Sequence, residues 1–109
     1  MRNPTKARAF FPTYNQRFDL SSAEKFGEVT FLVKSDIPSP FRTQELVERL
    51  ETELSLLEFN PSVDYIGLTG STIHVSLLTA AVAANHEVFN VLMFDAVEDR
   101  YVIREIDLS

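Results

Sequence analysis

The 109-residue sequence contains no cysteine, which excludes disulfide bonds and thiolate metal sites and fits a reducing compartment. No apolar run approaches the ~20 residues that a membrane helix needs, and the first residues lack the pattern of a secretory signal. Hydrophobic residues make up 45% of the chain and charged residues 24%, which is ordinary for a globular protein. We therefore expect a cytoplasmic protein with one folded domain and no membrane contact.

Positive charge is also scarce. The chain has 10 Lys and Arg against 16 Asp and Glu, which gives a formal net charge of −6. Residues 1–25 hold five basic and two acidic residues, a net charge of +3, whereas residues 26–109 hold five basic and fourteen acidic residues, a net charge of −9. An acidic body does not attract nucleic acid through bulk charge. Binding of RNA or a nucleotide would therefore need a local site or the basic first segment.

This basic first segment places two arginines among aromatic residues in RAFFPTYNQRF, residues 8–18. Such rings could stack on nucleic-acid bases, or they could fix the segment to the body or to a neighbouring subunit. The second interpretation is favoured because the cations are few for a nucleic-acid-binding arm. We predict that residues 1–25 form an extended basic aromatic arm, able to contact a protein partner, and that residues 26–109 form a single α/β domain.

The rest of the chain alternates strand-like and helix-like segments. β-branched and aromatic runs predict strands, whereas leucines at helical spacing and an alanine-rich apolar run predict helices. The expected elements are a strand at 28–34, a helix from about 40 to 58, a strand at 63–68, a helix at 73–84, and strands at 88–94 and 100–108. This β-α-β-α-β-β order predicts a small, mostly parallel α/β sheet whose last strand returns as an antiparallel hairpin.

The turn LTGSTIH, residues 68–74, is the first candidate ligand site. Ligands of a parallel α/β sheet bind at the carboxyl ends of strands, and there this turn would meet the N-terminus of the second helix. Its candidate ligand residues are Thr69, Gly70, Ser71 and Thr72. Gly70 allows close approach, and the hydroxyls and free backbone N–H groups could bind an anion. The alternative is an ordinary helix cap made by Ser71 or Thr72. No GxxxxGK[ST] motif is present, so the turn is not the phosphate-binding loop of an NTPase.

Three further side chains are expected at the same edge of the sheet. Asp36 follows the strand at 28–34, Asp95 follows the strand at 88–94, and His74 lies in the first turn of the second helix. Asp95 could bind a metal or orient a ligand, or it could bond the backbone N–H groups of a turn. His74 could act in catalysis or metal binding beside Asp95, or it could be an ordinary half-buried histidine.

His86 ends the second helix and should therefore lie at the opposite edge from Asp95. The strand between them spans about 20 Å at ~3.3 Å per residue, so the two side chains cannot share a site within one chain. They could share one between two subunits. Otherwise His86 is a helix C-terminal residue that interacts with the helix dipole. Neither histidine belongs to an HExxH motif or another zinc-binding spacing.

Four pieces of the sequence together resemble a known family: LTG at 68–70, VSLLTAAVAANH at 75–86, VLMFD at 91–95 and YVI at 101–103. Residues 63–104, and more loosely 28–58, resemble the small type III CRISPR-associated ring nucleases, which degrade cyclic tetra-adenylate and have been described as manganese-dependent RNA exonucleases. The resemblance implies an antiviral defence protein that forms a homodimer or higher oligomer with its site between subunits. It also implies that His86 and Asp95 are catalytic and hold Mn²⁺ or another divalent cation, with a cyclic oligoadenylate or RNA as ligand.

The chain departs from this family after two of the four matching pieces, LTG and VLMFD. The family has an Arg-Gly-Pro turn where this chain has Ser71 and Thr72, and it has Pro-Arg after the aspartate where this chain has Ala96 and Val97. Both arginines that would bind phosphate are thereby absent. Two hypotheses follow. The protein is a metal-dependent phosphodiesterase related to the ring nucleases, or it is a non-catalytic oligomeric adaptor or inhibitor on the same fold, encoded by a phage or other mobile element.

Overall fold

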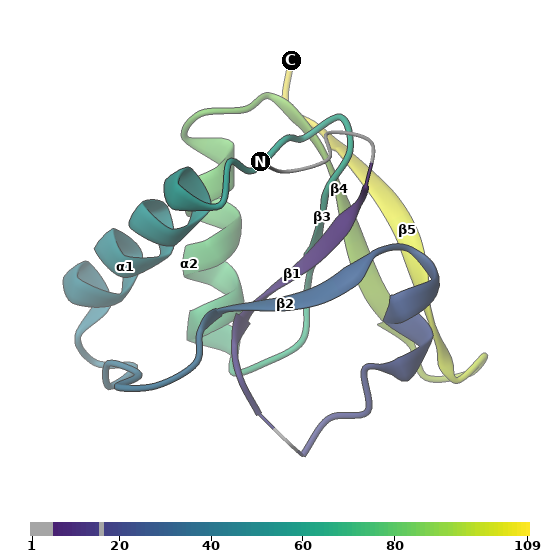
Figure 1. Ribbon diagram of the computed structural model, residues 1–109, viewed down its shortest axis with the longest axis horizontal. Helices are drawn as coiled ribbons and strands as arrows, with labels where there is room; N and C mark the ends of the chain where they lie inside the picture. The colour runs from purple at the N-terminus through teal and green to yellow at the C-terminus, as the bar shows by residue number, and fades with distance from the viewer. Residues whose placement is uncertain (1–5, 16) are drawn as a thin grey trace.

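A five-stranded sheet with two α-helices and a short 3-10 helix forms the fold (Figure 1). The computed structural model describes residues 6–15 and 17–109, so residues 1–5 and 16 of the predicted arm lie outside the described residues. The strands are β1 (Arg8–Thr13), β2 (Glu28–Val33), β3 (Tyr65–Gly67), β4 (Val88–Asp95) and β5 (Arg100–Asp107), and they lie in the order β2-β1-β3-β4-β5. Strands β1 to β4 pair in parallel, and β5 pairs antiparallel with β4. The predicted mostly parallel α/β sheet with an antiparallel C-terminal hairpin is confirmed.

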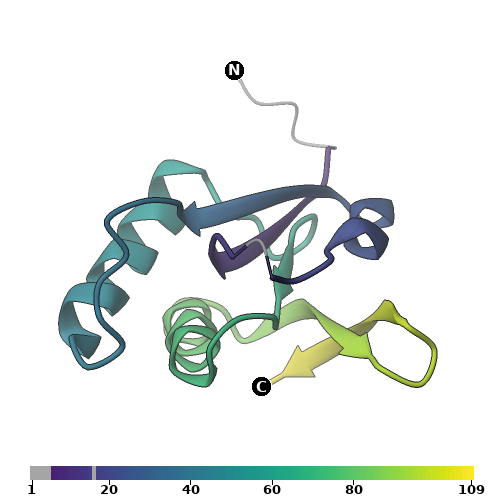
Figure 2. The same ribbon diagram turned by 90° about the horizontal axis from the view of Figure 1, so that it is seen from below.

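The helices α1 (Thr43–Leu56) and α2 (Thr72–Ala83) cover one face of the sheet, and the 3-10 helix η1 (Ser21–Lys25) lies on the other face (Figure 2). The buried residues of α1 recur every four positions, as the leucine spacing predicts: Leu46, Leu50 and Leu54. Among residues 6–15 and 17–109, no helix combines the length and the apolar character needed to cross a membrane.

The prediction of an extended arm is wrong for residues 8–13, because they form β1, the strand between β2 and β3. Ala9, Phe10 and Phe11 are at most 1% exposed. Phe10 packs under the α-helices and Phe11 packs on the η1 face, since successive side chains of a strand point to opposite faces. A strand buried on both faces lacks the alternation of apolar and polar residues that marks a half-buried strand. Here the apolar run is also short and flanked by polar residues, so it resembles an arm.

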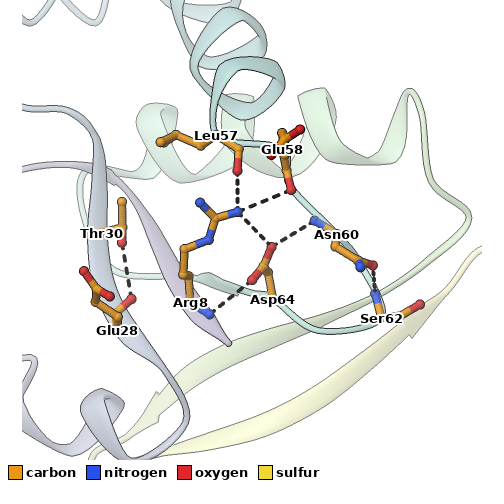
Figure 3. Close-up of polar contacts among 8 residues, drawn as sticks. All are labelled: Arg8, Glu28, Thr30, Leu57, Glu58, Asn60, Ser62 and Asp64. Atoms are coloured by element: carbon orange, nitrogen blue, oxygen red, sulfur yellow. Dashed lines mark hydrogen bonds and ion pairs between the residues drawn. The ribbon is translucent and has the colours of Figure 1, made fainter. Parts of the chain in front are cut away.

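Arg8, predicted to be a cation of the arm, is a structural residue at the start of β1. Its guanidinium lies 4.6 Å from the centroid of the Phe10 ring and 3.3 Å from the carboxylate of Asp64, which is fully buried. It also donates to the backbone carbonyls of Leu57 and Glu58, as Figure 3 shows. These bonds tie β1 to the segment between α1 and β3.

The connection from β1 to β2 carries η1 and covers the second face of the sheet. There Ala23 of η1 belongs to one apolar cluster with Phe11 and Tyr101. Gly67 of β3 makes room for this cluster, because a Cβ atom at that position would lie 2.2 Å from the Phe11 ring. Aromatic side chains thus fill the space under η1, and they continue toward the carboxyl edge of the sheet.

The order in which the chain adds strands to the sheet reverses at β1. The chain leaves β1 for β2 through η1, and it then crosses through α1 to β3 on the other side of β1. The carboxyl ends of β1 and β3 are therefore adjacent, while the segments that follow them run to opposite faces. Open α/β sheets bind their ligands at such a topological switch point.

Candidate functional site

A cleft of about 490 Å³ opens beside this switch point, at the carboxyl edge of the sheet. One wall comes from the connection between β1 and β2 and is formed by Arg17, Phe18, Asp19, Ser21 and Ser22. The remaining walls are residues 68–70, which follow β3, and three residues of the β4–β5 hairpin, Phe94, Asp99 and Tyr101. Small-molecule sites typically have volumes of ~300–1,000 Å³. The cleft is therefore large enough to hold a ligand.

Tyr101 forms a buried, hydrogen-bonded part of the cleft wall. Its side chain is only 3% exposed, and its hydroxyl lies 2.6 Å from the hydroxyl of Thr69. Its backbone N–H donates to Ser22 Oγ at 3.2 Å, so the hairpin, β3 and the η1 segment are linked at this residue. Burial raises the pKa of Tyr101, the negative charge of Asp19 adds to this effect, and the bond with Thr69 opposes it. The phenol is therefore protonated near neutral pH.

The charges that line the cleft are mostly negative. Within residues 6–15 and 17–109, the lining has Asp19 and Asp99 against one cation, Arg17, which leaves one negative charge in excess. The backbone N–H of Ser21 donates to the Asp19 carboxylate at 2.9 Å, and this bond together with one from the Ser21 side chain lowers the pKa of Asp19 below 3.8. Asp19 is thus a carboxylate at neutral pH. The cleft suits a neutral or cationic ligand better than a polyanion.

The turn LTGSTIH divides between the cleft and α2. Thr69 and Gly70 line the cleft, and Gly70 has a φ of +144°, which favours glycine. Ser71 is the N-cap of α2, because its Oγ accepts the backbone N–H of His74 at 3.3 Å. The prediction of a helix cap is confirmed for Ser71. Thr72 begins α2 and is exposed.

The sequence also matches a protein-family model over almost all of its length. Residues 4–108 match the family model described as phage Pam3 gp32-like protein. The chain belongs to this family. No curated protein and no solved structure matches it. Membership in the gp32-like family agrees better with the hypothesis of a phage-encoded protein than with that of a ring nuclease.

In this member of the gp32-like family, His74 lies beside β1. Its Nδ1 is 3.4 Å from Thr13 Oγ1, and its Nε2 is buried without a hydrogen-bond partner among the described residues. Burial lowers the pKa of His74 below its ordinary value of 6.5, so the imidazole is neutral near pH 7. The sequence predicts two roles for His74, a catalytic or metal-binding residue beside Asp95 and an ordinary half-buried histidine, and this environment fits the second.

Asp36 and Asp95 lie at the predicted edge, but they are not among the residues that line the cleft. Asp36 has a φ of 51° in the loop between β2 and α1, and its carbonyl oxygen accepts a bond from the guanidinium of Arg49. The carboxylate of Asp95 accepts the backbone N–H groups of Val97 at 3.0 Å and Glu98 at 3.2 Å. Of the two roles considered for Asp95, the structure shows the one in which its carboxylate bonds the backbone N–H groups of a turn.

His86 and Asp95 lie at opposite ends of β4. The His86 ring packs against Phe59, with 5.4 Å between centroids, in a separate hollow of about 350 Å³ between α1 and α2. Within the described part of the chain, no three His, Asp or Glu side chains are grouped so that they could hold a metal ion. The residues of one chain therefore do not fit the Mn²⁺ site that the ring-nuclease resemblance implies. A shared site between two subunits stays a prediction.

Sequence reasoning misses the wall of the cleft formed by residues 17–22. The predicted arm hides β1, and with it the loop that follows the carboxyl end of β1. Tyr101 is missed because nothing local marks one residue of a predicted edge strand as a contact of Thr69. The available signal was the apolar run AFF followed by the turn-forming residues of YNQ, which together indicate a short strand and its exit loop.

Proposed function

We propose that this phage-family protein is a non-catalytic adaptor or inhibitor, and that the carboxyl-edge cleft is its binding site. The observation that carries the proposal is the position of the cleft. It lies beside the switch point between β1 and β3, where open α/β sheets bind ligands. Its walls come from three segments far apart in the chain, so the fold itself shapes the site.

The chemistry of the lining residues supports binding over catalysis. The hydroxyls of Thr69 and Tyr101 bond to each other, and Asp19 accepts the backbone N–H of Ser21. A nucleophile in an enzyme needs a base within hydrogen-bond reach, and the Thr69 hydroxyl is bonded to the protonated phenol of Tyr101, which is not a base near neutral pH. These side chains are suited to hold a ligand by shape and hydrogen bonds.

The charge of the cleft supports an adaptor or inhibitor over a ring nuclease. Cyclic tetra-adenylate and RNA carry a phosphate at each nucleotide, and proteins usually bind phosphates through arginine or lysine. Among the described residues that line the cleft, one cation, Arg17, stands against two carboxylates. The ring-nuclease hypothesis would instead need His86 and Asp95 to meet between two copies of the chain.

An experiment with two arms tests the proposal. In the first, small neutral aromatic compounds are titrated into the ¹⁵N-labelled full chain, and we expect amide shifts centred on Phe18, Thr69 and Tyr101. Phe18→Ala should weaken these interactions. Leu56→Ala should leave them unchanged, because Leu56 is a 71% exposed residue of α1 outside the cleft. Compounds that bind only elsewhere would overturn the assignment of the cleft.

In the second arm, the full chain is incubated with cyclic tetra-adenylate and Mn²⁺, and the products are separated by chromatography. We expect no turnover. Cleavage that disappears in both His86→Ala and Asp95→Asn would overturn the proposal and establish the ring-nuclease hypothesis. The same samples analysed by sedimentation would test the predicted homodimer, which a composite site requires.

A further inference from the structure

A second hollow, of about 540 Å³, adjoins the cleft on the η1 side of the sheet. Both hollows are lined by Phe18, Asp19 and Ser21, so these residues form a common wall. The second hollow also has Tyr14 and Phe31 in its lining. We call the two hollows together the Phe18 groove. Each hollow can hold a small group, and side by side they can hold an extended chain that places one side chain in each.

Half-exposed aromatic rings line the Phe18 groove. Tyr14 is 50% exposed, and Phe18 and Phe94 are each 44% exposed. The Phe94 ring packs edge-on against Tyr101 with 5.3 Å between centroids, and the Tyr14 ring packs in the same way against Phe31 at 5.1 Å. The outer rings are thus supported by inner rings. Grouped, exposed and rigid aromatic side chains are typical of surfaces that bind other proteins.

The charges of the groove indicate which partner it suits. In the part of the chain that the structure describes, Asp19, Glu24 and Asp99 line the groove against one cation, Arg17, and the chain as a whole has a net charge of −6. Nucleic-acid bases could stack on the rings, but three carboxylates would repel the phosphates that accompany them. A polypeptide with lysine or arginine side chains is complementary in charge, and its apolar side chains can fill the hollows.

We infer that the Phe18 groove binds an extended polypeptide segment in which apolar and basic side chains alternate. The apolar side chains enter the two hollows, and the basic ones, which start on the opposite side of the extended chain, bend back along their long stems to pair with Asp19, Glu24 and Asp99 at the rim. This inference rests on the proposed function, since it names the class of ligand for the same cleft. Beyond the proposed function, the inference includes the second hollow in the binding site and states that the partner is positively charged.

Defined peptides test the inference. A short capped peptide that alternates leucine and lysine is titrated into the ¹⁵N-labelled full chain, and a peptide with glutamate in place of lysine and a short oligoadenylate are titrated in parallel. We expect only the leucine–lysine peptide to shift amides in both hollows, at Phe31 and at Tyr101. Phe18→Ala should weaken its binding about tenfold, as expected for loss of a central aromatic contact.

Charge variants provide the matched controls. The double variant Asp19→Asn and Asp99→Asn should weaken binding of the leucine–lysine peptide, and Arg17→Gln should strengthen it. Glu48→Gln, which removes a negative charge on the exposed side of α1, should have no effect. Equal weakening by Glu48→Gln would mean nonspecific attraction and would overturn the inference.

The other outcomes separate the inference from the proposed function. Binding of the glutamate peptide or the oligoadenylate in the groove would overturn the inference on ligand class and leave the cleft as a binding site. The same holds if aromatic compounds bind the cleft and no peptide does. If neither the aromatic compounds nor the peptides shift the amides of Phe18, Thr69 and Tyr101, both the inference and the proposed function fail.

Discussion

Asp64 is fully buried and forms an ion pair with Arg8. Its Oδ1 accepts the backbone N–H of Arg8 at 3.1 Å, and its Oδ2 accepts that of Asn60 at 2.9 Å and the guanidinium of Arg8 at 3.3 Å. The Arg8 side chain is itself only 12% exposed. Because both charges are shielded from water, removing Asp64 leaves the buried guanidinium of Arg8 without this carboxylate.

We expect Asp64→Ala to lower the free energy of unfolding by about 3–5 kcal/mol, the usual cost of breaking a buried ion pair. Urea denaturation measures this change. In a double-mutant cycle with Arg8→Met, the loss in the double variant should be smaller than the sum of the two single losses. The exposed pair between Lys6 and Glu28 is the control, and Lys6→Met should change stability by no more than about 1 kcal/mol. Similar losses in Asp64→Ala and Lys6→Met would contradict a structural role for the buried pair.

His74 makes stability depend on pH. Burial lowers the pKa of His74 in the folded protein below 6.5, so the unfolded chain takes up a proton at a higher pH than the folded chain does. The stability that neutral His74 contributes is therefore fully present above about pH 6.5, and it is lost as the pH falls toward the lower folded-state value. Stability therefore falls as the pH falls, because burial disfavours the charged form of the His74 imidazole.

We expect His74→Gln to be less sensitive than the wild type to a fall in pH from about 7.5 to about 5, because glutamine does not titrate. Urea denaturation at several pH values, with the wild-type curve subtracted from that of the variant, isolates this contribution from the carboxylates. An NMR titration of the His74 ring gives the folded-state pKa directly. A ring that titrates at or above 6.5 would contradict the prediction.

At the scale of elements, the start of α2 decides how LTGSTIH is used. The Ser71 hydroxyl is committed to the backbone N–H of His74, whereas Thr69 and Gly70 face the cleft. A helix begins well when a serine, threonine, aspartate or asparagine satisfies one of its first free N–H groups. The turn therefore stabilises α2 with one residue and contributes to the cleft with the two before it.

We expect Ser71→Ala to destabilise the protein by about 0.5–2 kcal/mol through loss of the cap, and Ser71→Asp to retain most of the stability. Thermal unfolding measures both. Neither substitution should change binding in the cleft, because Ser71 is not among its lining residues. A loss of ligand binding in Ser71→Ala at unchanged stability would instead indicate an anion site at this turn.

At the scale of the whole molecule, β1 is the strand on which the sheet depends. It pairs with β2 over five residue pairs and with β3 over two, and it contributes Phe10 and Phe11 to the cores on the two faces. Without β1, the sheet would divide into β2 alone and the three strands β3 to β5. Residues 26–109, which the sequence predicts to be the domain, therefore lack a strand that the fold requires.

We expect a chain of residues 26–109 to be unfolded, with neither a cooperative thermal transition nor a dispersed NMR spectrum. A well-dispersed spectrum from this chain would contradict the central role of β1. Substitutions in the full chain separate the effect of β1 from that of length. Phe10→Ala should cost about 3–5 kcal/mol because the ring is fully buried, and Phe41→Ala, at a residue 93% exposed, should change stability by no more than about 0.5 kcal/mol.

The sequence by itself determined the elements whose signals are local. The leucines of α1, the cap at Ser71 and the hairpin of β4 and β5 are confirmed, because helical spacing, capping and a short turn depend on residues close together in the chain. The opposite positions of His86 and Asp95 follow from the length of one strand in the same way.

Only the tertiary structure decided that residues 8–13 are a central strand and that the cleft exists. Ala9 lies beside Val29 and Tyr65, so the partners that bury it are distant in sequence. The wall at residues 17–22 meets Thr69 and Tyr101 for the same reason. Pairing between distant strands satisfies backbone hydrogen bonds and buries apolar surface that no local pattern marks as paired. The cleft therefore depends on the position of β1 between β2 and β3, which the tertiary structure alone shows.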